Sequence, residues 1–65
     1  MTLNEFIEHI KHNSLEIDIF IEGQFCYCGS IGAFKTHLKR EKYGDYKIQK
    51  IEPLSTNLEI FLERK

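Results

Sequence analysis

Two cysteines and three histidines are the side chains of this chain that could do chemistry. Cys26 and Cys28 are one residue apart, and His9 and His12 would complete a set of four zinc donors. Alternate residues on a strand lie roughly 7 Å apart, which is loose for a shared metal or a disulfide. The expected N-terminal helix also turns both histidines away from its apolar face. We therefore expect two free thiols, no metal site and no cofactor.

A thiol nucleophile with a histidine base is the second chemical possibility. His37 would approach Cys28 if a helix began directly behind the strand that carries the cysteine. No third side chain at a recognisable spacing would orient the histidine, and 65 residues leave little room for a pocket. The sequence predicts that this protein is not an enzyme.

An acidic set in the first half is the main candidate for binding. Carboxylates alternate with isoleucines from residue 16 to 22, and Phe20 shares their side of the expected strand. Carboxylates on a strand repeat at roughly 6.5–7 Å, close to the phosphate repeat of a nucleic acid, so the row could occupy a DNA-binding cleft. Such a row also keeps a solvent-facing strand soluble. The predicted protein-binding residues are Glu16, Asp18, Phe20 and Glu22.

A basic set in the second half supports an alternative function. Residues 33–65 hold eight basic and five acidic side chains, whereas residues 1–32 hold five acidic side chains and one lysine. Tyr43 and Tyr46 are interleaved with the cations, which suits phosphate contacts and base stacking. A solvated helix flank is the simpler interpretation. The predicted nucleic-acid-binding residues of this alternative are Lys35, Lys39, Arg40 and Lys42.

The first element that must position these residues is a helix over residues 3–12. Thr2 and Glu5 form a capping box, in which each side chain bonds the backbone amide of the other residue. Apolar residues recur with helical spacing, and Asn13 is suited to end the helix. They are Leu3, Phe6, Ile7 and Ile10.

Residues 15–28 predict a β-hairpin around Gly23, with two possible registers. A two-residue loop places both cysteines on the isoleucine face and leaves Phe25 and Tyr27 beside Phe20. A three-residue loop with a bulge at Gly23 places Phe25 and Tyr27 on the isoleucine face instead. The second register is favoured, because only glycine then needs a positive φ and more aromatic area is buried.

The second half predicts another helix followed by another hairpin. Ser30 is a helix cap, Ile31, Phe34 and Leu38 form the apolar stripe, and Gly44 is a stop. A strand begins at residue 45, and the phase of its apolar residues indicates a bulge near residues 49–50. A turn over 53–57 precedes a last strand over 58–62. The predicted fold is a small α+β domain of order αββαββ, an antiparallel four-stranded sheet with two helices packed on one face.

The pattern of the second half resembles small proteins carried by phages and mobile elements of Gram-positive bacteria. It comprises Gly29-Ser30, a short helix, Tyr46-x-Ile48-x-x-Ile51 and Asn57-Leu-x-Ile60-x-Leu62. The resemblance covers residues 15–62 and carries over no functional residue. It implies a binder that blocks a host enzyme or an anti-CRISPR-like inhibitor of a defence complex.

Length and composition indicate one domain over residues 1–65. Hydrophobic residues make up 42% of the chain and charged residues 29%, which is ordinary for a folded protein. With no apolar run long enough for a bilayer and no leader peptide, we expect a cytoplasmic protein that binds no membrane. Phe20 and Phe61 on the uncovered sheet face predict a homodimer. The leading hypothesis is a protein-binding inhibitor whose partner is a host protein or nucleoprotein; nucleic acid is the alternative partner.

Overall fold

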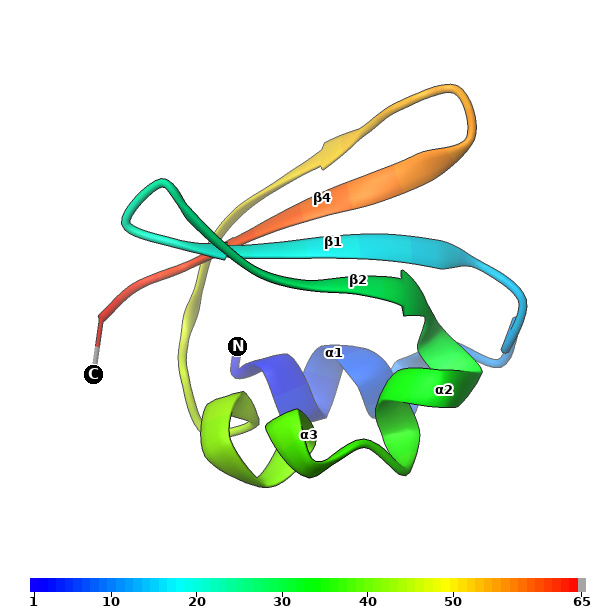
Figure 1. The fold of residues 1–65 in the computed structure, drawn as a ribbon, viewed down its shortest axis with the longest axis horizontal. Helices are drawn as coiled ribbons and strands as arrows, with labels where there is room; N and C mark the ends of the chain where they lie inside the picture. The colour runs from blue at the N-terminus through cyan, green and yellow to red at the C-terminus, as the bar shows by residue number, and fades with distance from the viewer. Residues whose placement is uncertain (65) are drawn as a thin grey trace.

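The computed structural model describes residues 1–64, which form an α+β domain with a four-stranded mixed sheet. All helices lie on the same side of the sheet (Figure 1). In chain order the elements are α1 (Leu3–His9), β1 (Glu16–Ile21), β2 (Gln24–Ser30), α2 (Ile31–Lys35), α3 (Leu38–Tyr43), β3 (Ile48–Pro53) and β4 (Asn57–Leu62).

The strand order is β2-β1-β4-β3, and the central strands β1 and β4 run parallel. The prediction of an antiparallel sheet is therefore wrong for this pair, although both hairpins are antiparallel. The parallel pairing joins the two strands whose apolar residues alternate most regularly, with Ile19 opposite Ile60 and Ile21 opposite Leu62. Placing these strands at the centre buries their inner faces most completely, as is usual for parallel pairs.

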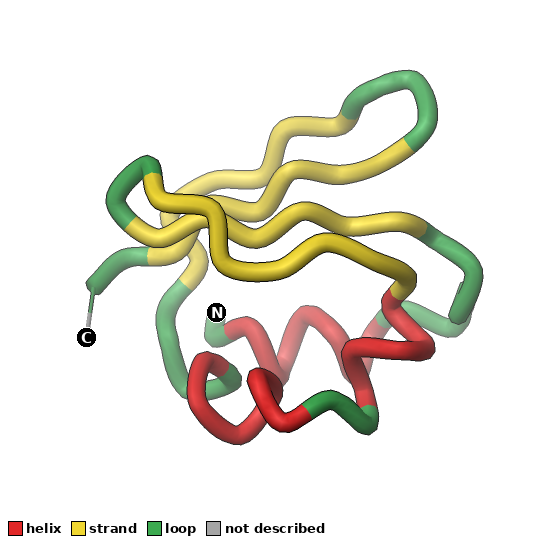
Figure 2. Tube along the Cα trace, in the orientation of Figure 1, coloured by secondary structure: helices red, strands yellow, loops and turns green. Residues whose placement is uncertain are grey.

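The core lies between the sheet and the helices. Leu3 and Ile7 of α1 and Ile31 and Phe34 of α2 are fully buried against the inner sides of the central strands. Figure 2 shows the helices in one layer beneath the sheet, and α3 belongs to this layer. No residue of α3 is buried. Among the described residues, no helix is long and apolar enough to cross a membrane.

The first hairpin combines features of both predicted registers. Glu22 and Gly23 form a two-residue loop with φ of +50° and +78°, as a type I′ turn requires. The register then shifts, so that Phe20 faces Phe25 whereas Ile19 faces Tyr27. The favoured three-residue loop is wrong, because the bulge lies one step inside β2, at Cys26. This bulge buries Tyr27 on the isoleucine side and leaves Phe25 and Cys28 on the other.

The predicted second helix is divided into α2 and α3. Ser30 caps α2, its Oγ accepting from the Ala33 amide at 3.1 Å, as the sequence predicts. This helix ends at Lys35, and the His37 side chain, which accepts from the Lys39 amide, caps the start of α3. Leu38, expected in the apolar stripe, is consequently 83% exposed. Gly44 ends α3 as predicted.

The other local predictions concern α1 and the second hairpin. The capping box of Thr2 and Glu5 is present, but α1 ends at His9 rather than residue 12. The strand expected from residue 45 begins at Ile48. A register shift between Ile48 and Lys50 confirms the predicted bulge.

Candidate protein-binding face

The side of the sheet opposite the helices carries the candidate site. No helix or loop of the described residues covers this side (Figure 1). We call it the acidic–aromatic face and define it by the outward residues of all four strands. They are Glu16, Asp18, Phe20, Phe25, Cys28, Lys50, Glu52, Asn57, Glu59 and Phe61.

Three phenylalanines form a continuous row across β2, β1 and β4. The Phe20 ring stacks on Phe61, with centroids 5.1 Å apart and planes 15° apart, and meets Phe25 edge-on at 5.7 Å. Phe25 is 60% exposed, while Phe20 and Phe61 are half-buried. Ring contacts of this kind stabilise a pair by about 0.5–1.5 kcal/mol, so the row holds its shape without a covering layer.

Three carboxylates form a second row beside the phenylalanines. Asp18 of β1 pairs in register with Glu59 of β4, which pairs with Glu52 of β3. Neighbouring strands are about 4.8 Å apart, so the three side chains lie next to one another on the same surface. The Asn57 side-chain amide donates to Asp18 at 2.8 Å, and Lys50 pairs with Glu52 at 3.1 Å. The part of the face next to the aromatic row is therefore negatively charged.

The structure brings together three of the four predicted protein-binding residues. Glu16, Asp18 and Phe20 share the acidic–aromatic face, whereas Glu22 lies in the turn and pairs with Arg64 at 3.0 Å. Glu52 and Glu59 were not among the predicted site residues. Their alternation with inward apolar residues signals the outer face, but only the pairing of β1 with β4 places them beside Asp18.

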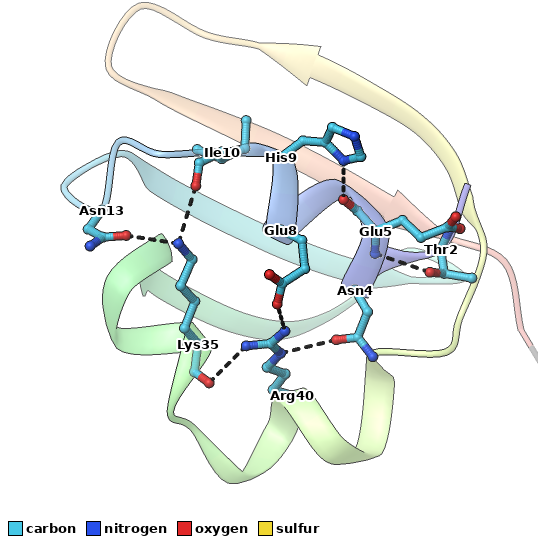
Figure 3. Close-up of polar contacts among 9 residues, drawn as sticks. All are labelled: Thr2, Asn4, Glu5, Glu8, His9, Ile10, Asn13, Lys35 and Arg40. Carbon is cyan, nitrogen blue, oxygen red and sulfur yellow. Dashed lines mark hydrogen bonds and ion pairs between the residues drawn. The ribbon is translucent and has the colours of Figure 1, made fainter.

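Two basic residues of the alternative site, Lys35 and Arg40, are bound to other groups of the fold (Figure 3). The Lys35 ammonium donates to the Ile10 carbonyl at 3.2 Å and to Asn13 at 3.1 Å. Arg40 pairs with Glu8 and donates to Asn4 at 3.1 Å and to the Lys35 carbonyl at 3.2 Å. These bonds tie α2 and α3 to α1 and its end.

The remaining two cations of that set are placed differently. Lys39 donates to the carbonyl oxygen of Cys26, the bulge residue of the edge strand β2. The Lys42 ammonium lies 5.3 Å from the centroid of the Tyr43 ring. Each of the four cations thus makes its own contact within the fold.

The cysteines and histidines do not converge. Both thiols are free, and Cys28 points to the acidic–aromatic face. His37 lies on the helix side, where its ring meets Tyr27 at 5.2 Å, so β2 separates it from Cys28. His9 donates through Nδ1 to the Glu5 carbonyl at 2.7 Å. Among the described residues no group of three or more potential ligands could hold a metal ion.

The contacts of Arg40 and Thr2 predict acid-sensitive stability. The hydrogen bond and the charge of Arg40 lower the pKa of Glu8, and hydrogen bonds from Thr2 lower the pKa of Glu5. Their stabilising contribution is complete above the ordinary carboxyl pKa of 4.5 and is lost as pH falls through the lower pKa values of the folded state. We expect the urea midpoint to fall as pH is lowered from about 5 to about 3.

The variant Arg40→Met measures how much of the acid-induced loss of stability comes from Glu8. It should be less stable than the parent near neutral pH and should lose less stability on acidification. The urea midpoint, measured by circular dichroism at several pH values, checks both effects. Parallel pH profiles for parent and variant would contradict the assignment.

Family models, curated proteins and solved structures were each compared with the chain, and none of the three comparisons found a match.

Proposed function

We propose that this chain is a small non-enzymatic protein-binding module that inhibits a target by covering part of its surface. The target class is a host enzyme or a defence complex, and the chain is of the phage-encoded type. The observation that carries the proposal is the acidic–aromatic face, where three rings and four carboxylates lie together and no other element covers them. Aromatic side chains on an uncovered surface are typical of protein interfaces.

The edges of the sheet are poorer binding sites than its face. Both edge strands contain a bulge, at Cys26 in β2 and at Gln49 in β3. Lys39 occupies the Cys26 carbonyl, and Pro53, which has no amide hydrogen, ends β3. Bulges, lysines and prolines are the usual obstacles to adding another strand at an edge. Binding through side chains of the face is therefore favoured over strand addition.

Charge also favours a protein partner over a nucleic acid. Rings on an open sheet could stack on bases, but here the neighbouring carboxylates would repel phosphates. Lys35 and Arg40, which the nucleic-acid alternative requires, hold the helices together. Among the described residues, neither the acidic–aromatic face nor the helices that carry Lys35 and Arg40 combine exposed rings with several cations free to bind phosphates.

The test is a comparison of three immobilised proteins. The three proteins are the parent, the double variant Glu16→Lys/Asp18→Lys and the control variant Glu41→Lys. The control reverses an exposed charge on α3. Glu16 and Glu41 are exposed, and Asp18 is half-buried on an uncovered face, so thermal melting should show all three proteins folded. We expect parent and control to capture the same protein from a Gram-positive bacterial lysate and the double variant to lose it. The purified target should then lose activity when parent is added.

Two results would overturn this proposal. One is a capture pattern that the double variant leaves unchanged. The other is binding to random duplex or single-stranded DNA tighter than about micromolar at physiological salt, with a salt dependence that Lys39→Glu reduces.

A further inference from the structure

We propose that the partner presents arginine side chains to the acidic–aromatic face, each one stacked on a phenylalanine ring and paired with the neighbouring carboxylate. This inference rests on the proposed function and specifies the chemistry of the partner. Two observations support it. The row of phenylalanines and the row of carboxylates lie side by side, and Lys50 already contacts both rows.

Ring and carboxylate alternate along each central strand. On β1 the outward residues Asp18 and Phe20 are two positions apart, and on β4 Glu59 and Phe61 repeat the arrangement in register. Residues two apart on a strand lie roughly 7 Å from each other, within reach of one long cationic side chain. The face therefore offers two pairs of a ring and a carboxylate, side by side, and Lys50 already lies over the ring of the pair on β4.

Lys50 shows on β3 how a cation fits such a pair. Its ammonium lies 4.7 Å from the centroid of the Phe61 ring and 3.1 Å from a carboxylate oxygen of Glu52. The same side chain thus contacts the aromatic row and the carboxylate row at once. No lysine or arginine of the described residues occupies the corresponding place at Phe20 and Asp18, where a partner's cation would lie.

Repulsion within the carboxylate row favours the binding of a cation from a partner. Like charges directly opposite one another on adjacent strands destabilise a sheet, and Asp18, Glu59 and Glu52 are three such neighbours. Asn57 and Lys50 relieve the two outer members. The side chain of Glu59, the central one, makes no hydrogen bond or ion pair within the described residues, and Glu59 is only half-buried. A cation placed there gains attraction from all three carboxylates.

Arginine suits this surface better than lysine does. A guanidinium group is flat, stacks on aromatic faces and binds a carboxylate through two parallel hydrogen bonds. A second copy of this chain suits it less, because two acidic–aromatic faces brought together would each contribute four carboxylates against one lysine. Charge complementarity thus selects a basic partner over the homodimer that Phe20 and Phe61 predict.

The experiment uses two synthetic peptides that differ only in their cation. One contains four arginines spaced by glycine and the other four lysines, and each is titrated into the isotope-labelled chain and followed by NMR. We expect the arginine peptide to bind more tightly, by about twofold or more, because a guanidinium stacks on a ring and pairs with a carboxylate at once. The shifted amide signals should belong to β1 and β4.

Variants separate the two contacts. Phe20→Leu keeps an apolar residue but removes one ring of the two pairs, so it should reduce the preference for arginine, while Phe61 retains part of it. Glu59→Gln should weaken both peptides, whereas Glu41→Gln on α3 should weaken neither. Equal affinity for the two peptides, shifts confined to other elements, or no binding at millimolar peptide would overturn the inference. A dimer that Glu59→Gln strengthens would overturn it too, since the face would then serve self-association.

Displacement of a captured target distinguishes failure of this inference from failure of the proposed function. If the function is wrong, no protein is captured that the Glu16→Lys/Asp18→Lys variant loses. If only the inference is wrong, such a protein is captured, but the arginine peptide releases it no better than the lysine peptide does. Preferential release by the arginine peptide supports both.

Discussion

Replacing Phe34 with alanine is expected to remove much of the unfolding free energy of the domain. The Phe34 side chain is fully buried, and its ring meets that of Tyr27 with centroids 4.8 Å apart. Truncating a buried phenylalanine costs about 3–5 kcal/mol. A domain of this length has roughly 3–10 kcal/mol of unfolding free energy in total, so one such cavity removes much or all of it.

Thermal and urea unfolding followed by circular dichroism measure this effect. Phe25→Ala is the matched control, because Phe25 is 60% exposed and lies at one end of the aromatic row, where its ring meets Phe20 edge-on. We expect this control to change the unfolding free energy by about 1 kcal/mol or less. If the two variants melted at similar temperatures, the assignment of Phe34 to the core would be wrong.

Gly29→Asn should destabilise the domain by about 2–4 kcal/mol, through backbone strain and crowding together. Gly29 has a φ of +152°, which side-chain-bearing residues rarely adopt. An added Cβ would lie 2.8 Å from the Tyr27 hydroxyl oxygen. That hydroxyl donates to the Ser30 carbonyl at 3.3 Å, and the tyrosine ring packs against Phe34, so it has little freedom to move away.

The same substitution at Gly23 provides the control. Gly23 has a φ of +78° in the hairpin turn, and an added Cβ would meet no described atom within 4 Å. Asparagine tolerates left-handed turn geometry, so Gly23→Asn should change the unfolding free energy by less than about 1 kcal/mol. Urea denaturation of the two variants gives the comparison. Similar losses at both glycines would contradict the assignment of the larger cost at Gly29 to its φ of +152° and its contact with Tyr27.

Features that depend on near neighbours in the chain could be predicted from the sequence. The capping box at Thr2 and the cap at Ser30 need only residues three positions away, and both are present. The outer position of Glu16, Asp18 and Phe20 follows from alternation with buried isoleucines. The bulge before Ile51 follows from the phase of its apolar neighbours. Each of these signals is complete within one element.

The neighbours of each strand, by contrast, were decided by the tertiary structure. Alternation shows which side of a strand is apolar but does not say which strands adjoin, so the parallel pairing of β1 with β4 was missed. That pairing places Glu59 and Phe61 beside Asp18 and Phe20 and thereby creates the acidic–aromatic face. Likewise, Arg40 looks like an exposed cation in the sequence, yet it bonds residues of α1 more than thirty positions away. Such contacts depend on how the apolar faces of all the elements pack into one core, and no local pattern encodes that choice.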